Sequence, residues 1–346
     1  MNAGGMIANT GGTNAAPAGV GGAVVATGGA APTSAGGIPG NGGLAMGGSA
    51  NGGTPGAGGG SGGVAPSGGA PSGGEGGSSG SSDICGRWQA DRANLSEGAW
   101  SGSVMGCDAG DLSPDARANA LRLVNLYRFL AGLPAVTDDP TMDAQDQQCA
   151  LMMRANNMLS HMPPMSWTCW TQEGATAANG SNIGTAPAVA SIDGYMLDPG
   201  NPTSIGHRRW LLSNQLGPIG IGGTDHTSCL MTTGGTGHAG KAWTAWPPPG
   251  DVPYQVMAST FQGSVDTTGW TVQSDTINLS AATVTVMFDG AAQPVTVTQL
   301  GQYYGSTYAI RFNPQGWTTQ AGKKYSVSVG GVTPAIAYDV NVVACN

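Results

Sequence analysis

The four histidines are the residues of this chain best suited to chemistry, and all of them lie between positions 161 and 238. His161 stands in an L-S-H-M stretch, and His207 opens the stretch G-H-R-R-W-L-L. A neutral imidazole can bind a divalent metal, and near neutral pH it can also act as a general acid or base. These two histidines are therefore the first candidates for a functional site.

Three other side chains are weaker candidates. Asp225 and His226 could be a ligand pair or an acid-oriented base, but they lie in a Gly- and Thr-rich segment where we expect a solvated turn, and we expect His238 to lie in a flexible loop. Glu173 precedes the G-S-N-I segment and could reach a site built around His161. Outside the Gly-rich segment 1–82 the chain has no G-x-S-x-G motif, which argues against serine hydrolases. It has no P-loop, and the G-x-G-x-x-G at 235–240 is followed by an expected strand rather than by the helix of a dinucleotide-binding motif, which argues against nucleotide-binding enzymes.

The elements that must position His161 and His207 can be predicted from spacing and end signals. Ser, Pro and Asp at 113–115 predict a helix start, and Gly132 ends that helix. A second helix is expected from Asp139-Pro140 to about Leu159, and a loop over 161–184. The remaining expected elements are a helix over 187–197, a helical turn over 207–212 and strands over 216–222, 228–233 and 242–246.

The order helix, His, G-x-N-I, helix, G-H-R-x-x-L-L, G-x-G resembles the CAP superfamily, also called the SCP-like extracellular domain. In this sequence the last two motifs fall at 205–212 and 217–222. The resemblance covers about residues 113–246. It implies an α+β fold, in which a three-layer α-β-α sandwich surrounds a central cleft.

The resemblance also implies a set of cleft residues. Two His and two acidic residues often line this cleft in the family, and some members bind Zn²⁺ there. The matching positions are His161, His207 and, for the second acid, Asp198; Ser181 occupies the place of the first acid. Zinc accepts two His and one carboxylate with an open fourth position, so these three residues form the expected metal site. Ser181 and Asn182 are then expected to support a His or a bound water by hydrogen bonding.

Three functions remain open at this point. The first is an extracellular binding module whose cleft takes a lipid, a glycan, a protein or a divalent metal. The second is a metal-assisted hydrolase in which His161 and His207 hold an activated water. The third is a structural spacer of the cell envelope.

The cysteine content indicates an oxidising compartment. Six cysteines without a C-x-x-C pair predict up to three disulfides and a secreted or cell-surface protein. Cys149 with Cys169 is the preferred pair, because this bond would fasten the loop that carries His161. The first ten residues lack the basic stretch of a signal peptide, so we expect a truncated or misassigned start. The six candidates for disulfides are Cys85, Cys107, Cys149, Cys169, Cys229 and Cys345.

Composition limits the classes of partner. Only 9% of the residues are charged and the net charge is −8, with no basic cluster, which excludes a nucleic-acid role. The sequence contains no apolar run long enough for a transmembrane helix. Residues 1–82 are a Gly-, Ala-, Ser- and Pro-rich segment, which we expect to be a disordered arm that can tether the protein to a surface.

The remaining sequence is expected to form two domains. Residues 83–250 would form the CAP-like domain. Residues 251–346 change to short runs of β-branched and aromatic residues separated by turns such as Asp289-Gly290. This pattern predicts a small all-β sandwich of immunoglobulin-like or fibronectin-like type.

Overall fold

The computed structural model describes residues 81–258 and 262–345, all of which belong to one compact unit. The predicted Gly-rich arm lies outside the described residues, except for its last two positions, which begin the first helix. Within the described part of the chain, no helix is both long and apolar enough to cross a membrane. The α-helices are α1 (Ser81–Arg92), α2 (Pro114–Leu130), α3 (Pro140–Asn156), α4 (Gln172–Gly180), α5 (Ala188–Leu197), α6 (Gly206–Leu211) and α7 (Val265–Thr268), and a 3-10 helix covers Tyr254–Val256.

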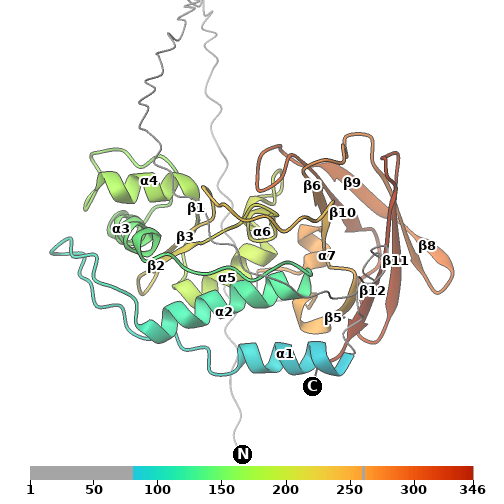
Figure 1. Cartoon of the computed structure of the whole chain (residues 1–346), viewed down its shortest axis with the longest axis horizontal. Helices are drawn as coiled ribbons and strands as arrows, with labels where there is room; N and C mark the ends of the chain where they lie inside the picture. Colours follow the sequence, from blue (N-terminus) through green and yellow to red (C-terminus); the bar gives the residue numbers. More distant parts are fainter. Residues whose placement is uncertain (1–80, 259–261, 346) are drawn as a thin grey trace, which may run out of the picture. The chain divides into compact units, whose positions relative to one another are not determined.

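A small antiparallel sheet lies between two layers of helices, as the family resemblance implies. Its strands are β1 (Ser181–Gly184), β2 (Gly220–Gly223) and β3 (Ser228–Met231), in the order β1-β3-β2. Helix α3 packs on β2, β3 and α4, whereas α5 contacts all three strands and packs against α2. Figure 1 shows α3 and α4 above this sheet and α2 and α5 below it. The expected three-layer α-β-α sandwich is confirmed.

The two long helices begin where the sequence predicts. Ser113 caps α2, because its hydroxyl accepts the backbone N–H of Ala116 at 3.2 Å. Asp139 caps α3 in the same way, through its carboxylate. Helix α3 ends at Asn156 rather than near Leu159, because Asn157 adopts a left-handed conformation with φ of 48°. His161 therefore stands in the loop after α3 and not at its last turn.

The G-x-G motif brings β2 into backbone contact with α3. A Cβ at Gly222 would lie 2.1 Å from the backbone carbon of Asp146, and one at Gly220 would lie 2.7 Å from that of Met142. Any side chain larger than hydrogen at these two positions would push the helix off the sheet. This motif therefore sets the close packing of the first layer on the second.

The sequence-based expectation lacks helix α1, helix α4 and strand β1 in the first part of the described chain, and α7 and the 3-10 helix in the second. Helix α1 lacks a clear apolar periodicity, although Ile84 and Trp88 bury against the core. Helix α4 and strand β1 fall in the expected loop 161–184. Gly174 suggested a loop there, but its real role is close packing: a Cβ at this position would lie 3.1 Å from the backbone of α3.

The C-terminal part consists of two facing sheets, seen at the right of Figure 1. The sheet orders are β4-β6-β10-β9 and β5-β12-β11-β7-β8. Trp270 on β6 meets Tyr325 on β11 edge to face, with 5.9 Å between ring centroids, which joins the two sheets. The expected all-β region is confirmed, whereas its kinship to immunoglobulin or fibronectin domains stays a prediction. The strands are β4 (Thr244–Trp246), β5 (Gly250–Pro253), β6 (Trp270–Ser274), β7 (Thr283–Phe288), β8 (Ala291–Gln293), β9 (Val295–Gln299), β10 (Tyr308–Pro314), β11 (Lys324–Gly330) and β12 (Ile336–Val343).

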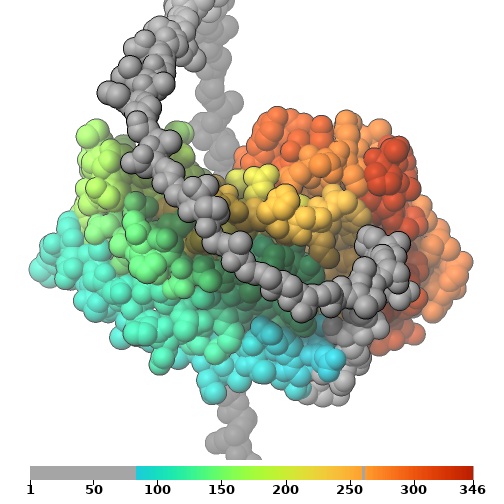
Figure 2. Space-filling model, viewed as in Figure 1, coloured from blue at the N-terminus to red at the C-terminus, as the bar shows by residue number. Residues whose placement is uncertain are grey.

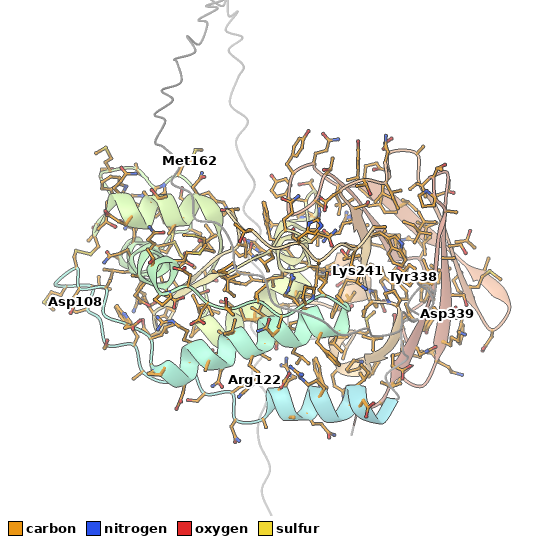
Figure 3. All side chains as sticks on the ribbon, in the orientation of Figure 1. Asp108, Arg122, Met162, Lys241, Tyr338 and Asp339 are labelled. Carbon is orange, nitrogen blue, oxygen red and sulfur yellow. A yellow bond between two sulfur atoms is a disulfide. The ribbon has the colours of Figure 1, made fainter. Side chains whose placement is uncertain are left out.

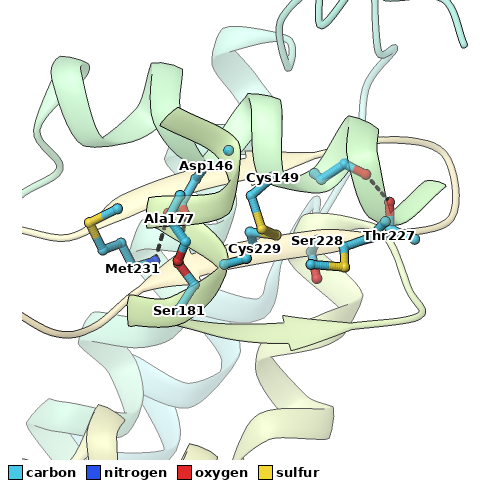
Figure 4. Close-up of a disulfide and its surroundings, with 12 residues drawn as sticks. Asp146, Cys149, Ala177, Ser181, Thr227, Ser228, Cys229 and Met231 are labelled. Carbon is cyan, nitrogen blue, oxygen red and sulfur yellow. Dashed lines mark hydrogen bonds between the residues drawn. A yellow bond between two sulfur atoms is a disulfide. The ribbon is translucent and has the colours of Figure 1, made fainter. Parts of the chain in front are cut away.

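All six cysteines are paired, but the expected pair of Cys149 with Cys169 is wrong. Cys149 lies on the buried face of α3, opposite β3, and bonds to Cys229 on that strand (Figure 4). Cys169 lies in the loop before α4 and faces another loop instead of α3. The three disulfides are Cys85–Cys345, Cys107–Cys169 and Cys149–Cys229.

The α-β-α part and the C-terminal sheets of the described chain are joined by strand pairing, hydrogen bonds and a common core. Strand β4 lies before the boundary expected at 250, yet it pairs with β6 beyond that boundary. Arg208 of α6 is fully buried, and its guanidinium donates to the carbonyls of Met196 and Gly269 at 2.6 Å each. One continuous apolar core includes residues from α2, α5 and the C-terminal strands. The domain limits proposed from the sequence stay a prediction.

Candidate functional site

A cavity of about 250 Å³ brings His161 and His207 together, although they are 46 positions apart in the sequence. Its walls come from the loop after α3, the α4–β1 junction, the segment around α6, the end of β3 and the β9–β10 loop. Figure 2 shows the yellow surface around α6 directly beside the orange surface of the C-terminal strands. The lining residues are His161, Asn179, Gly180, Ser181, Asn182, Asn201, Ser204, Gly206, His207, Trp210, Thr232, Thr233, Tyr303 and Tyr304.

His207 is held by Asp198 in a fixed orientation. One carboxylate oxygen of Asp198 lies 3.0 Å from Nδ1 of His207, and the other accepts the backbone N–H of His207 at 2.9 Å. The ring of Tyr195 packs edge to face on the imidazole, with centroids 4.9 Å apart. Because a carboxylate accepts but does not donate, Nδ1 carries the hydrogen and Nε2 keeps its lone pair. No hydrogen bond within the described residues occupies that Nε2.

The ring of His161 is also held through its Nδ1, but by a backbone carbonyl instead of a carboxylate. Its Nδ1 lies 2.7 Å from the carbonyl oxygen of Ala178 in α4, so Nδ1 again carries the hydrogen. Unlike His207, the side chain of His161 is exposed to solvent. The cavity is thus lined by two imidazoles. The Nε2 atom of each can accept a hydrogen bond or bind a metal ion.

The G-S-N-I segment supports the site through Asn182. The side-chain amide of Asn182 donates to the backbone carbonyl of His207 at 3.1 Å, and the backbone carbonyl of Asn182 accepts the hydroxyl of Tyr195 at 3.1 Å. Asn182 is 1% exposed, so it connects β1, α5 and α6 from within the protein. Asn182 thus holds the backbone of His207 in place, whereas its expected support of a metal-binding His or a bound water stays a prediction.

Ser181 does not support an imidazole as the sequence suggested. Its Oγ lies 2.7 Å from Oδ1 of Asp146 and 2.6 Å from the carbonyl of Ala177 (Figure 4). A hydroxyl has one hydrogen, so both contacts are satisfied when Asp146 is protonated and donates to Ser181. Burial raises the pKa of Asp146 to about 7, which is consistent with that proton. Ser181 therefore belongs to a buried hydrogen-bond chain beneath the cavity.

The C-terminal part completes the cavity, which was not expected from the sequence. The guanidinium of Arg209 donates to the carbonyls of Gly301 at 2.6 Å and Ser306 at 3.1 Å, which fixes the β9–β10 loop beside α6. The loop then presents Tyr303 and Tyr304, which are 75% and 44% exposed, at the wall of the cavity. Two adjacent tyrosines between glycines were a signal for an exposed aromatic loop, but their partner on α6 had no signal in the local sequence.

The glycine of the G-H-R motif makes room for this loop. A Cβ at Gly206 would lie 2.9 Å from Cδ1 of Tyr304. Glycine at this position therefore lets the tyrosine ring pack directly on the backbone of α6.

The weaker candidates lie elsewhere. Asp225 lies 2.9 Å from Arg154 and 3.3 Å from His226 on the exposed surface, outside the cavity. Glu173 and His238 are exposed, and neither lines this cavity.

The donor set does not fit a zinc site with the usual three or four protein ligands. No three His, Cys, Asp or Glu side chains come together as a metal-binding group in the described ranges. Asp198 does not line the cavity, and both of its oxygens are hydrogen-bonded to His207. Zinc held by His161, His207 and Asp198 thus stays a prediction; the donors at the cavity are two imidazoles, and no step below is derived through a metal.

Comparison with known proteins gives one family. Residues 121–229 match the model of the CAP family, described as the Cysteine-rich secretory protein family. Among solved structures, the chain is similar to an extracellular protein containing a SCP domain from Bacillus anthracis str. Ames. That similarity has 24% identity and a TM-score of 0.26, and it covers 35% of this chain and 44% of the Bacillus chain. No curated protein matches the chain.

Proposed function

Residues 121–229 of this chain form a CAP domain, and on that premise we propose that the protein is an extracellular binding module whose cavity takes a neutral, hydroxyl-rich ligand such as a glycan. The observation that carries the proposal is the chemistry of the cavity wall. The residues that line it include three asparagines, four hydroxyl side chains of Ser or Thr, two imidazoles and three aromatic rings, but no Asp, Glu, Lys or Arg.

These groups match the two kinds of surface that a sugar presents. Asn amides and hydroxyls both donate and accept, as sugar hydroxyls require, and each imidazole Nε2 adds an acceptor. Trp210, Tyr303 and Tyr304 offer flat apolar faces for the C–H faces of a sugar ring, with polar edges that tolerate water. A charged ligand would lack a partner of opposite charge at this wall. A purely apolar lipid would leave the free imidazole Nε2 atoms and the hydroxyl of Thr232 unpaired.

A buried hydroxyl at the cavity supports the same proposal. Thr232 lines the cavity and is 3% exposed, and its Oγ1 has no hydrogen-bond partner among the described residues. An unpaired buried hydroxyl costs about 1–3 kcal/mol, so a ligand that reaches it gains by satisfying it.

Binding is a better fit than glycan hydrolysis. Most glycosidases use a pair of carboxyl groups beside the scissile bond. The residues described at this wall include none, and the carboxylate of Asp198 is committed to orienting His207. The three disulfides further support secretion or display at the cell surface, where such bonds persist.

The test is saturation-transfer NMR on the full chain with neutral oligosaccharides built from glucose, N-acetylglucosamine or mannose. We expect at least one series to bind. Tyr303→Ala, which removes a mostly exposed ring, and His161→Ala should each abolish most of the signal. His226→Ala is the matched control, because this histidine is exposed and lies outside the cavity. Equal binding by all four proteins would disprove the proposal, and so would an absence of binding by every series.

A further inference from the structure

The surface carries an unusual concentration of methionine beside the cavity. Seven large apolar side chains are exposed in the described residues, and four of them are methionines. Three of these fall within eight positions of the loop after α3: Met158 at 59% exposure, Met162 at 82% and Met165 at 77%. Figure 3 shows Met162 at the outer surface beside α4. His161 lies between the first two methionines.

The loop that carries these side chains is closed at its base. The side-chain amide of Asn156 donates to the carbonyl of Thr168 at 2.9 Å, and its carbonyl accepts the N–H of Thr168 at 3.0 Å. The disulfide from Cys169 to Cys107 fixes the chain directly after this closure. The indole N–H of Trp170 also donates to the carbonyl of Pro163 at 3.2 Å, which ties the middle of the loop down. A closed loop of this kind pre-organises whatever its side chains bind.

The backbone bends within the segment that carries the three methionines. The N–H of Met162 donates to Oγ of Ser160 at 3.1 Å, which turns the chain at His161. Met158 and Met162 are four positions apart, and Met162 and Met165 are three apart. The distance that their flexible side chains must span to reach one ion is therefore short. His161 stands at the same bend, and the hydrogen bond between its Nδ1 and the carbonyl of Ala178 leaves Nε2 free.

We propose that Met158, His161, Met162 and Met165 form a surface site for a soft monovalent metal ion, Cu⁺ or its analogue Ag⁺. Thioether sulfur and imidazole nitrogen are the donors that Cu⁺ prefers, and carboxylates, which favour harder ions, are absent from the segment 157–171. The hydrogen bond from Nδ1 to a backbone carbonyl is the support that metal-binding histidines usually have. This site goes beyond the glycan proposal; because Nδ1 of His161 is held by Ala178, a bound ion would take Nε2, the same atom that the cavity offers to a sugar.

The chemistry of the patch favours a metal over an apolar partner. The exposed apolar groups of this loop are thioethers rather than aromatic rings, and Leu159, at 37% exposure, is the only other large apolar side chain exposed in it. Exposed thioethers are also readily oxidised outside the cell. Three of them in one loop are therefore a liability unless sulfur itself has a role.

The experiment is a titration of the full chain with Ag⁺ alone. The methyl NMR signals of its 14 methionines report the binding. We expect one equivalent to bind and to shift the signals of Met158, Met162 and Met165. The signal of Met105, which is 98% exposed elsewhere, should stay in place. Cu⁺ affinity is then measured by competition with a chromophoric chelator, with ascorbate as reductant so that the disulfides remain intact.

The variants separate sulfur ligation from apolar contact. Met162→Leu and Met165→Leu keep apolar volume but remove sulfur. Each should weaken Cu⁺ binding by at least about tenfold, since loss of even a supporting group costs a metal site that much. Met105→Leu should change nothing, and the response to oligosaccharides should persist in all three variants. The proposal is overturned if Met105 responds equally, if the leucine variants bind like the original chain, or if no Ag⁺ binds.

Discussion

Each histidine of the cavity has its Nδ1 committed to one acceptor, which leaves Nε2 for the ligand. For His207 the acceptor is the carboxylate of Asp198, which also accepts the backbone N–H of the same residue. Asp198 is thus a positioning residue: it sets the tautomer and the orientation of His207 without reaching the cavity itself. For His161 a backbone carbonyl does the same, so this tautomer does not depend on Asp198.

Replacement of Asp198 by Asn tests this assignment. An amide has one acceptor oxygen, so it cannot serve both Nδ1 and the backbone N–H of His207. In Asp198→Asn we expect part of the His207 population to move its hydrogen to Nε2. Two-bond nitrogen–proton NMR of the imidazoles reads this directly, and His161 is the internal control. An unchanged His207 tautomer would show that Asp198 does not set it.

Asp146 makes stability depend on pH. Burial raises its pKa from 3.8 to about 7, so the folded protein keeps a proton that the unfolded chain releases. The free energy of unfolding should therefore fall as pH rises from about 4 to 7, by up to about 1.4 kcal/mol per pH unit from this group. Asp146 destabilises the folded protein fully at pH values above its folded-state pKa, and it does not do so at pH values below its unfolded-state pKa.

Asp146→Asn should remove that slope. The amide N–H₂ can donate to Ser181 and its oxygen can accept the N–H of Met231, as the protonated acid does. We expect the variant to be more stable than the original chain at pH 8 and similar at pH 4, by urea unfolding at several pH values. Asp83→Asn, at an exposed position on α1, should keep the original slope. Parallel pH profiles for all three proteins would rule out a protonated Asp146.

At the scale of elements, the contact of β2 with α3 holds the first two layers together. The glycines of β2 allow this contact, and the Cys149–Cys229 disulfide crosses from the same helix to β3. Gly222→Ala should therefore destabilise the protein by about 3 kcal/mol or more, because its Cβ would overlap the helix backbone.

Gly86 provides the matched control for that prediction. It lies in α1, and a Cβ there would have no neighbour within 4 Å. Gly86→Ala should leave stability unchanged or raise it by about 0.5–1 kcal/mol, since alanine favours a helix. Thermal and urea unfolding measure both variants, and similar stabilities would contradict the close packing of β2 on α3.

At the scale of the whole molecule, α6 joins the CAP domain to the C-terminal sheets. Arg208 donates to carbonyls on both sides of the junction, and Arg209 holds the β9–β10 loop at the cavity. Burial lowers the pKa of Arg208 to about 10, which leaves it charged at neutral pH. Its charge is compensated by carbonyl oxygens rather than by a carboxylate in direct contact.

We predict that the original chain unfolds in a single calorimetric transition. Arg208→Ala should lower its stability by at least about 3 kcal/mol, because several buried carbonyls lose their donor. Arg87→Ala, on the partly exposed side of α1, should cost less than about 1 kcal/mol. Two well-separated transitions in the original chain would mean that the two parts fold independently.

Features encoded in short segments could be predicted from the sequence, whereas contacts between distant segments could not. Helices α2 and α3 carry their own start signals at Ser113 and Asp139, and the order of the motifs brought His161 and His207 together. The partner of Cys149, the role of Arg209 and the place of Tyr303 depend on contacts between distant segments. Local spacing contains no information on such contacts, so the C-terminal wall of the cavity became visible only in the structure.

The most direct test of the cavity uses its histidines as probes. The chain has four histidines, so it gives four imidazole Hε1 signals in proton NMR. When a neutral oligosaccharide that binds is added to the full chain, we predict that the signals of His161 and His207 move together along one binding curve. Those of His226 and His238, which lie outside the cavity, should stay in place. A bound oligosaccharide that leaves both His161 and His207 unmoved would contradict the account.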